Sequence, residues 1–253
     1  RTITADPFSA YGWAARALAL VENNRDQEAI TSALQALDLD DENVTAMAFL
    51  ALAYFGVDQD QTAFTWAERA INQDPDRFEG YYARGLIYEN SLAYLNPDLA
   101  EADYRAAYDL ALSQNPALLG DIAVGIARLQ ERVAFTNGTS DFTAAIATLE
   151  EVLQINPTNT SVLFRLGEIE YAGRGDFSRA LNYYQSCLDI DQENTACVYR
   201  AGRAHNALGN SVEALELFSR LVDELGSTDA YHYYWAGQMQ FALGDCALAA
   251  DYW

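Results

Sequence analysis

Hydrophobic and polar positions alternate with the period of an α-helix along most of the chain, most clearly over residues 163–192. Two amphipathic segments in this stretch flank a glycine-rich turn at positions 173–175. In the second segment Ala180, Tyr184 and Cys187 are spaced four and then three residues apart, so they share one face of a helix. The small Ala180 allows two helices to approach closely, and Tyr184 fills the space below it. The pattern predicts a pair of helices that needs neighbours to bury its apolar face.

The same pattern recurs with a period of about 34 residues. The turns that close successive helix pairs are 34, 34, 41, 41, 35 and 34 residues apart, and we expect the extra residues of the long intervals in the loops between paired helices. We expect residues 1–7 to be the tail of a preceding repeat or an N-terminal extension, and one array to span 8–253. The closing turns are at Pro7, Asp41, Pro75, Pro116, Pro157, Gln192 and Gly226. The pairs span 8–41, 42–75, 76–116, 117–157, 158–192, 193–226 and, in part, 227–253.

This pattern resembles the tetratricopeptide repeat in its small-x3-aromatic-x2-small run and in its glycine positions, such as Gly85, Gly167 and Gly202. The resemblance covers almost the whole chain. It implies an all-α fold in which about seven antiparallel helix pairs, the last one truncated, stack into a right-handed superhelical solenoid. It also implies a non-catalytic scaffold that binds a protein or peptide along a concave inner face, which the first helix of each pair lines.

Two residues depart from the family pattern, and one run is unusually apolar. Ala33 stands where the family has an aromatic residue, which predicts a looser or differently filled contact in the first pair. Tyr104 stands where the family has alanine, so we expect the helices of the third pair to be splayed. The run 46–57 is apolar on every side, which is typical of a helix that is buried all round or presents an apolar face to a ligand.

One column of the inner face, in the family register, is aromatic, and three of its members are 35 residues apart. Aromatic residues beside arginine supply much of the binding energy in protein interfaces. We therefore predict an aromatic groove over the fifth to seventh pairs, which binds an extended or helical segment and attracts a carboxylate to its arginines. The alternative for each ring is that it only packs against neighbouring helices. The groove residues are Tyr82, Phe164, Arg165, Tyr171, Tyr199, Arg200, Arg203, Asn206, Tyr234, Gln238 and Phe241, and Leu52, Phe55, Leu86 and Glu168 lie in adjoining columns.

The charge of the chain disfavours two classes of partner. The formal net charge is −22, and all 15 basic residues are arginine. This balance repels phosphates, which argues against nucleic acid and against an anionic membrane surface. A protein or peptide with basic or aromatic character is favoured instead. The longest apolar run, Ala46–Val57, is far shorter than the roughly 20 residues of a membrane-spanning helix, so we expect no membrane insertion.

Few residues could carry catalysis. The two histidines, His205 and His232, lie in predicted repeat helices and lack the spacing of a metal-binding or catalytic motif. Acidic residues cluster at 38–42 and 189–193, but neither cluster has the central glycine and closing glutamate of a calcium-binding loop. We therefore predict no catalytic residue, no metal site and no cofactor, and we interpret the acidic clusters as solvated turns.

Three cysteines are too few for a disulfide framework. Cys187 and Cys197 lie ten residues apart on either side of a predicted turn, and a bond between them would indicate an oxidising compartment. The alternative, which we favour, is that both are small buried hydrophobic residues. The compartment stays open, since a cytoplasmic and an exported segment both fit the sequence.

Two other functions fit the sequence. The chain ends at Tyr252-Trp253 without a polar capping helix and starts directly after a repeat-like fragment, so one alternative is a structural subunit that self-associates head to tail. The sequons at Asn43, Asn137 and Asn159 suit an extracellular or surface assembly of this kind. The other alternative is the interaction module of a longer enzyme.

Overall fold

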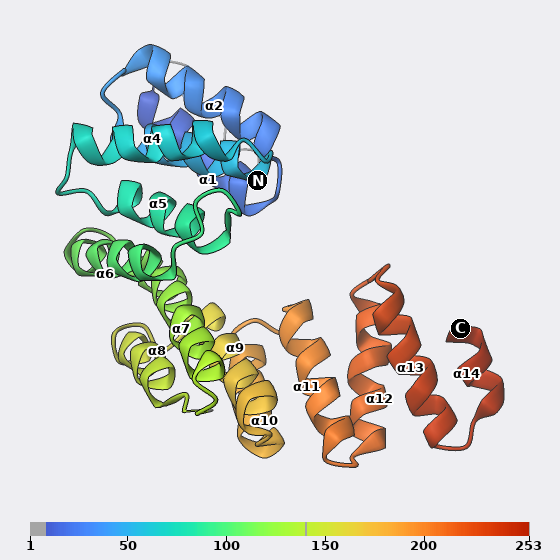
Figure 1. The fold of residues 1–253 in the computed structure, drawn as a ribbon. Helices are drawn as coiled ribbons and strands as arrows, with labels where there is room; N and C mark the ends of the chain where they lie inside the picture. Colours follow the sequence, from blue (N-terminus) through green and yellow to red (C-terminus); the bar gives the residue numbers. More distant parts are fainter. Residues whose placement is uncertain (1–8, 140, 253) are drawn as a thin grey trace. The chain divides into compact units, whose positions relative to one another are not determined.

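The computed structural model describes residues 9–139 and 141–252, and all regular secondary structure in these ranges is helical (Figure 1). Contacts between Cα atoms divide the chain into two compact units, and the division falls inside helix α7, between Leu129 and Gln130. Unit 1 precedes this division and unit 2 follows it. Residues 1–7 and Trp253, on which the predictions of a preceding repeat and an uncapped end depend, lie outside the described residues.

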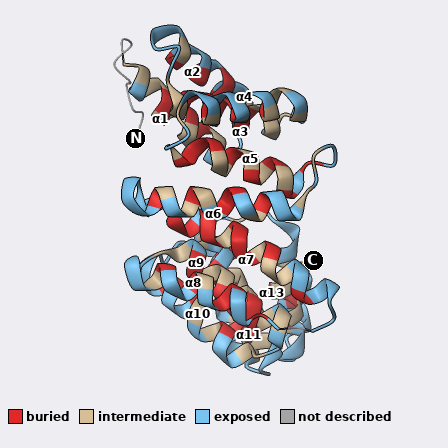
Figure 2. Cartoon of the chain, turned by 60° about the vertical axis from the view of Figure 1, so that its left-hand side comes forward, coloured by how far each residue is buried: buried red, intermediate tan, exposed pale blue. Residues whose placement is uncertain are grey.

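Unit 1 consists of three helix pairs and the first part of α7. The first helices α1, α3 and α5 pack on one another in this order, and each also packs on the second helix of its own pair. Figure 2 shows buried residues on the sides that these helices turn toward each other. The elements are α1 (Ala10–Glu22), α2 (Asp26–Leu39), α3 (Val44–Gly56), α4 (Asp60–Gln73), α5 (Phe78–Asn90), α6 (Pro97–Gln114), the short 3-10 helix η1 (Pro116–Leu118) and α7 (Leu119–Thr136).

Unit 2 contains the end of α7, then α8 and three further pairs, in which consecutive helices from α8 onward pack on one another. Two π-helical segments, η2 and η3, continue α9 and α12. None of the helices in the described ranges is long and apolar enough to cross a membrane. The elements are α8 (Thr143–Ile155), α9 (Thr160–Glu168), η2 (Ile169–Arg174), α10 (Phe177–Ile190), α11 (Thr195–Ala207), α12 (Ser211–Ser219), η3 (Arg220–Glu224), α13 (Ala230–Ala242) and α14 (Cys246–Tyr252).

A glycine in the first helix and an aromatic ring in the second bring the helices of a pair close together. Gly202 of α11 faces Phe218 of α12, and a Cβ atom at Gly202 would lie 2.9 Å from the ring. Gly167 and Tyr184 make the same contact between α9 and α10. Both rings are fully buried. These glycines are therefore needed for packing, because any side chain would overlap the ring.

The first two pairs replace this contact by two alanines. Ala17 and Ala51 occupy the glycine positions, and Ala33 and Ala67 occupy the aromatic positions. All four are fully buried in one core cluster. A methyl group on the first helix thus accompanies the loss of the ring on the second, which is the differently filled contact that the sequence predicts at Ala33.

The third pair is not splayed, and the prediction made from Tyr104 is wrong. The Tyr104 ring is fully buried against Gly85 of α5 and Gly125 of α7, where a Cβ would approach the ring to 2.9 and 2.8 Å. Ala100 and Ala107, also fully buried, complete the small-x3-aromatic-x2-small run around it. Tyr104 therefore takes the aromatic position, four residues away from the register that the sequence analysis assigned.

The extra length of the third pair explains this shift. The loop between α5 and α6, residues 91–96, is longer than the loop between α3 and α4, residues 57–59. The helix α6 is longer as well, with 18 residues against 14 in α4. The prediction that the extra residues lie in the loop is therefore only partly right. Because α6 is extended at its C-terminal end, more residues separate its core positions from Pro116. A register counted back from Pro116 is therefore wrong.

The predicted turn at 173–175 begins later than expected. Gly173 and Arg174 still belong to η2, and the chain leaves the helix at Gly175, whose φ of 68° lies in the left-handed region that favours glycine. A Cβ at Gly173 would lie 2.9 Å from the ring of Phe142. Gly175 thus makes the turn, whereas Gly173 makes room for packing.

The two acidic clusters belong to turns that connect one helix pair to the next. Asp40 and Asp191 each accept a hydrogen bond from the backbone N–H two residues ahead, at 3.3 and 3.1 Å. Asn43 and Asn194 then cap α3 and α11 by accepting from the N–H three residues ahead, at 2.9 and 3.1 Å. The carboxylates of these turns are exposed, which agrees with their interpretation as solvated turn charges.

Cys187 and Cys197 form a disulfide bond, so the interpretation that we favoured, two unbonded cysteines, is wrong. The bond joins the last turn of α10 to the first turn of α11, and both residues are fully buried. The short turn between the helices brings the two sulfur atoms together, which the sequence spacing alone does not establish. Cys246 is free and exposed.

Candidate functional site

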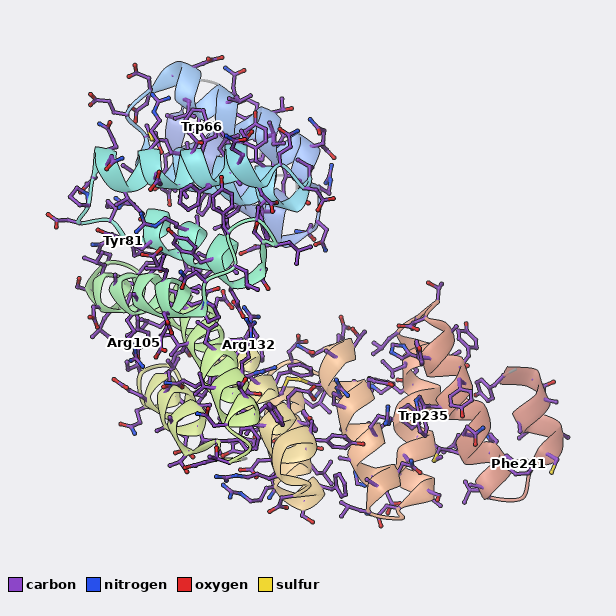
Figure 3. The ribbon with its side chains drawn as sticks, in the orientation of Figure 1. Trp66, Tyr81, Arg105, Arg132, Trp235 and Phe241 are labelled. Carbon is purple, nitrogen blue, oxygen red and sulfur yellow. A yellow bond between two sulfur atoms is a disulfide. The ribbon has the colours of Figure 1, made fainter. Side chains whose placement is uncertain are left out.

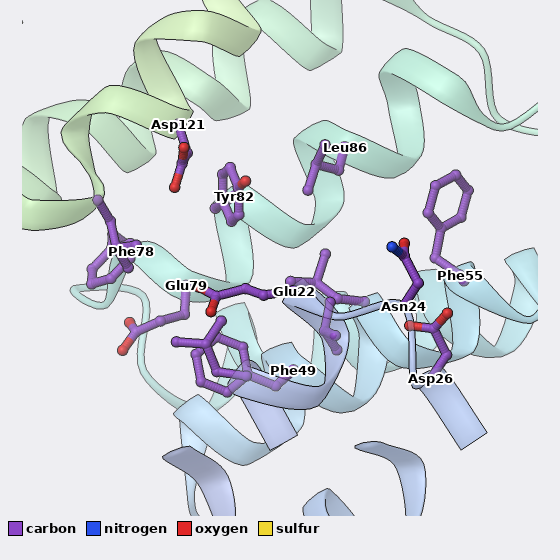
Figure 4. Close-up of a pocket in the computed structure, with 15 residues that line it drawn as sticks. Glu22, Asn24, Asp26, Phe49, Phe55, Phe78, Glu79, Tyr82, Leu86 and Asp121 are labelled. Carbon is purple, nitrogen blue, oxygen red and sulfur yellow. The ribbon is translucent and has the colours of Figure 1, made fainter. Parts of the chain in front are cut away.

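A cavity of about 430 Å³ opens in unit 1 between α1, α3, α5 and the start of α7 (Figure 4). A second hollow of about 440 Å³ adjoins it, and the two share lining side chains from α1, α3 and α5. We call the two hollows together the unit 1 groove. Its apolar wall includes Leu18, Phe49, Leu52, Phe78, Tyr82 and Leu86.

The helix α3 supplies one wall because it is apolar on every side. Residues 46–53 are all buried, and Phe49, Leu52 and Phe55 recur at intervals of three residues on the side that faces the cavity. The sequence left two possibilities for this helix, complete burial or an apolar face toward a ligand. In the structure α3 is largely buried and also lines the cavity.

Four residues of the predicted inner-face columns meet in this cavity. Tyr82 and Leu86 lie one turn apart on α5 (Figure 4), and Leu52 and Phe55 of α3 also line the cavity. Leu18 of α1 joins them. It lies 34 residues before Leu52 in the sequence, so extending the column by one period would have identified it.

Three carboxylates of the cavity wall, Glu22, Asp26 and Asp121, make no ion pair with any residue that the structure describes. Glu79, also in the wall, is buried and bound by Arg77 and by the hydroxyl of Thr45. The sequence analysis missed the three unpaired carboxylates. The sequence indicates only one of them, Glu22, which lies one turn after Leu18 on the first helix.

Other carboxylates of unit 1 are neutralised within the fold. Arg128 binds Glu89 through two hydrogen bonds of 2.9 and 2.8 Å, and Arg84 binds Asp103 through two of 2.7 and 2.9 Å. Such two-point pairs are the strong form of this interaction. The unpaired carboxylates of the cavity therefore stand apart from the ion pairs that hold the helices together.

The environment of Tyr82 is apolar and negative. Burial raises the pKa of its hydroxyl, and the charges of Asp121, Glu89 and Glu22 raise this pKa further, against an opposing effect of Arg128. Desolvation also raises the pKa of the Asp121 carboxyl, an effect that Arg128 reduces. The cavity thus combines an apolar wall with an excess of negative charge.

In the predicted aromatic column of unit 2, some rings pack inside the fold and one is exposed. The Phe164 ring lies 6.0 Å from the ring of Tyr184, and the Tyr199 ring lies 6.0 Å from that of Phe218, measured between centroids. Both rings are half-buried. Tyr234 is 47% exposed. Two of the three rings therefore pack on the second helix of their own pair and leave only part of their surface for a partner.

Two of the three predicted carboxylate-binding arginines have partners inside unit 2. Arg165 binds Glu131 at 2.6 Å, and Arg200 binds Glu168 at 2.7 Å. Glu168 also accepts a hydrogen bond of 2.6 Å from the hydroxyl of Tyr184. These two charges are already neutralised, so Arg203 is the remaining candidate of the three for binding a carboxylate of a partner.

Arg203 makes no ion pair with a carboxylate in the described part of the chain. Its guanidinium lies 4.2 Å from the ring centroid of Trp235, a residue of α13 marked in Figure 3, and donates a 3.1 Å hydrogen bond to the hydroxyl of Tyr199. Its Nε is buried and has no hydrogen-bond partner among the described residues. The sequence analysis missed Trp235, the ring on which this arginine stacks.

The other residues predicted for the unit 2 groove are spread over several elements. Tyr171 lies in η2, and its ring packs on Phe177 at 5.1 Å. Asn206 on α11 and Gln238 on α13 are half-buried, and Phe241 near the end of α13 is 55% exposed (Figure 3).

The two histidines pack against neighbouring side chains, and the His232 ring lies 5.0 Å from the ring of Tyr199 between centroids. The Nδ1 of His232 lies 2.7 Å from the Oγ of Ser227, and burial lowers the pKa of the ring. His205 lies near the side chain of Asn210. Within the described ranges no group of three or more His, Cys, Asp or Glu side chains is arranged to hold a metal ion.

Comparison with protein families gives two matches of the same description. A tetratricopeptide repeat model matches residues 14–78, and a second tetratricopeptide repeat model matches residues 171–233. Together they cover about half of the chain. No curated protein matches the sequence.

Solved structures with a similar fold include two proteins of comparable length. PilF of Pseudomonas aeruginosa has a TM-score of 0.65 at 18% identity, over 84% of this chain and 89% of PilF. PilW, described as a type IV pilus biogenesis factor, has a TM-score of 0.64 at 16% identity, over 92% of this chain and 98% of PilW. Yeast Tom70 has a TM-score of 0.69 at 18% identity, over 96% of this chain but 48% of Tom70. At these identities the likeness concerns the fold.

Proposed function

This chain belongs to the tetratricopeptide repeat family, whose members are in general protein-interaction modules, and from this premise we propose a specific mode of binding. The chain is a non-catalytic scaffold, and it holds a segment of a partner protein in the unit 1 groove. The first helices α1, α3 and α5 supply the contact surface, as the inner helices of a repeat array do.

The observation that carries this proposal is the cavity itself. Its volume of about 430 Å³ lies within the range of roughly 300–1,000 Å³ that is typical of ligand pockets. Its wall is apolar, and the adjoining hollow extends the surface along the same helices. One large apolar side chain buried here would contribute about 1.5–3 kcal/mol, which suits an anchor residue of a peptide.

The surface predicted in unit 2 forms a second part of the proposal. Arg203 stacks on Trp235, and its buried Nε–H donor has no partner in the ranges that the structure describes, so it suits a carboxylate of a bound segment. The exposed rings of Tyr234 and Phe241 lie on the same helix as Trp235 and supply apolar contact area.

The test is selection of random peptides displayed on phage against the whole purified chain. We expect selected peptides to contain an aromatic or large aliphatic residue. The substitution Leu86→Trp fills the cavity without removing apolar surface, and we expect it to weaken a selected peptide by roughly tenfold or more, equivalent to 1.4 kcal/mol. Fluorescence anisotropy with a labelled peptide measures the affinity.

The matched control is Leu92→Trp, because Leu92 is 96% exposed in the loop between α5 and α6. This variant should bind the peptide as the original chain does. Unchanged affinity in Leu86→Trp, or failure of the original chain to select any peptide, would show that the groove does not bind a partner segment.

A further inference from the structure

We infer that the segment held in the unit 1 groove places a lysine or arginine side chain against Tyr82, where Glu22 and Asp121 receive its charge. The inference rests on the proposed function and adds the chemistry of the bound residue. The charge of the bound residue is opposite to the one expected at the unit 2 surface, where an arginine would bind a carboxylate.

The first argument is charge. Glu22, Asp26 and Asp121 have no ion pair among the described residues, whereas Glu89 and Asp103 each hold an arginine. Closing a ligand over unpaired carboxylates beside an apolar wall is unfavourable unless the ligand brings the opposite charge. A cationic side chain of the partner supplies that charge, and an acidic or purely apolar segment does not.

The second argument is geometry. Figure 4 shows Asp121 and Glu22 on opposite sides of the Tyr82 side chain, and both lie close enough to raise the pKa of its hydroxyl. An aromatic ring flanked by two carboxylates suits a cation, because the ring face and the carboxylates both attract it.

The third argument concerns the shape of the ligand. Leu18 and Leu86 border this place, and the aliphatic stem of lysine or arginine would pack on them while its charged end reaches the carboxylates. The second hollow continues past Thr45 and Arg77, which is more room than one side chain needs. A polypeptide that carries the cation therefore fits this groove better than a free small cation.

The test compares peptide pools selected on the original chain and on Glu22→Gln/Asp121→Asn. Both carboxylates are exposed, and the substitutions conserve their shape. We expect lysine and arginine beside apolar residues in the first pool, and the same apolar residues without the cation in the second. Replacing the arginine of a selected peptide by citrulline should weaken binding to the original chain by about tenfold, and binding to the variant by less than about twofold.

The control is Asp38→Asn/Asp41→Asn, which removes the same charge from exposed positions outside the groove. This variant should keep the preference for cationic peptides. Equal loss in the control would mean that the net charge of −22 attracts basic peptides at long range, and the inference would be wrong.

Two further outcomes separate the inference from the proposed function. If Leu86→Trp abolishes binding but the citrulline substitution does not weaken it, the groove remains the binding site and the inference of a bound cation is wrong. Binding that Leu86→Trp leaves unchanged would overturn both. If free agmatine competes with the peptide and binds as tightly as the peptide does, the inference that a polypeptide occupies the groove is wrong.

Discussion

At Gly202 the absence of one methyl group decides how closely α11 and α12 can approach. The ring of Phe218 occupies the space that a Cβ would need. In the second pair Ala51 and Ala67 stand at the equivalent positions and are fully buried. The family pattern thus describes a joint volume of two residues, and either a glycine with a ring or two alanines can fill it.

This joint volume predicts that the effect of Gly202→Ala on the free energy of unfolding changes when Phe218 is replaced by alanine. Gly202→Ala alone should destabilise the protein by about 1–2 kcal/mol, because overpacking costs about 1–3 kcal/mol and the helix propensity of alanine returns up to about 1 kcal/mol. In a Phe218→Ala background the same change should be neutral or stabilising. Chemical denaturation of the four proteins measures the cycle, and the same cost in both backgrounds would refute the shared volume.

At the scale of elements, the disulfide between Cys187 and Cys197 ties two successive helix pairs together. It spans the turn between α10 and α11 with a sequence separation of 10 residues. The other turns between pairs rely on hydrogen bonds, such as those of Asp40 and Asn43. The covalent bond therefore adds a constraint at one junction of unit 2.

Reduction should lower the stability of unit 2. A loop of this length predicts a loss of about 3 kcal/mol on the chain-entropy model. Guanidinium unfolding with and without dithiothreitol measures the difference. Cys187→Ala/Cys197→Ala should be insensitive to the reductant, while Cys246→Ala should respond as the original chain does. Three free thiols in the native, unreduced protein would contradict the bond.

For the whole molecule the dominant feature is the excess of acidic residues. There are 37 carboxylate side chains and 15 arginines, so carboxylates outnumber arginines by 22. Repulsion among them opposes the compact state. Ion pairs such as Arg165 with Glu131 and Arg128 with Glu89 join helices within each unit, but they do not change this balance.

Added salt should therefore stabilise the protein at neutral pH. Raising the ionic strength from about 0.01 M to about 0.15 M shortens the screening length from about 30 Å to about 8 Å, and we expect Tm to rise, as measured by circular dichroism. At a pH near the isoelectric point of about 4.2 the rise should vanish. A fall of Tm with salt at neutral pH would mean that attractive pairs outweigh the repulsion.

Much of the architecture follows from local patterns, and the errors have identifiable causes. The small-x3-aromatic-x2-small run around Tyr184 is legible in the sequence because its members lie within two turns of one helix. At Tyr104 two neighbouring registers compete, and the extension of α6 made the count from Pro116 choose the wrong one. In the candidate site, Tyr82 and Leu86 were predicted from their columns, whereas Asp121 lies on α7, outside the regular period.

Periodicity along the chain by itself determined the helix pairs, their family and the residues available to an inner face, because a helix relates positions only three or four residues apart. The folded units decided which of these positions line a cavity, which arginines are already neutralised and which cysteines are bonded. Those outcomes depend on atoms from distant parts of the sequence, as where Asp121 and Glu22 both come close to Tyr82. Such encounters are set by how the helices stack, and no local pattern records them.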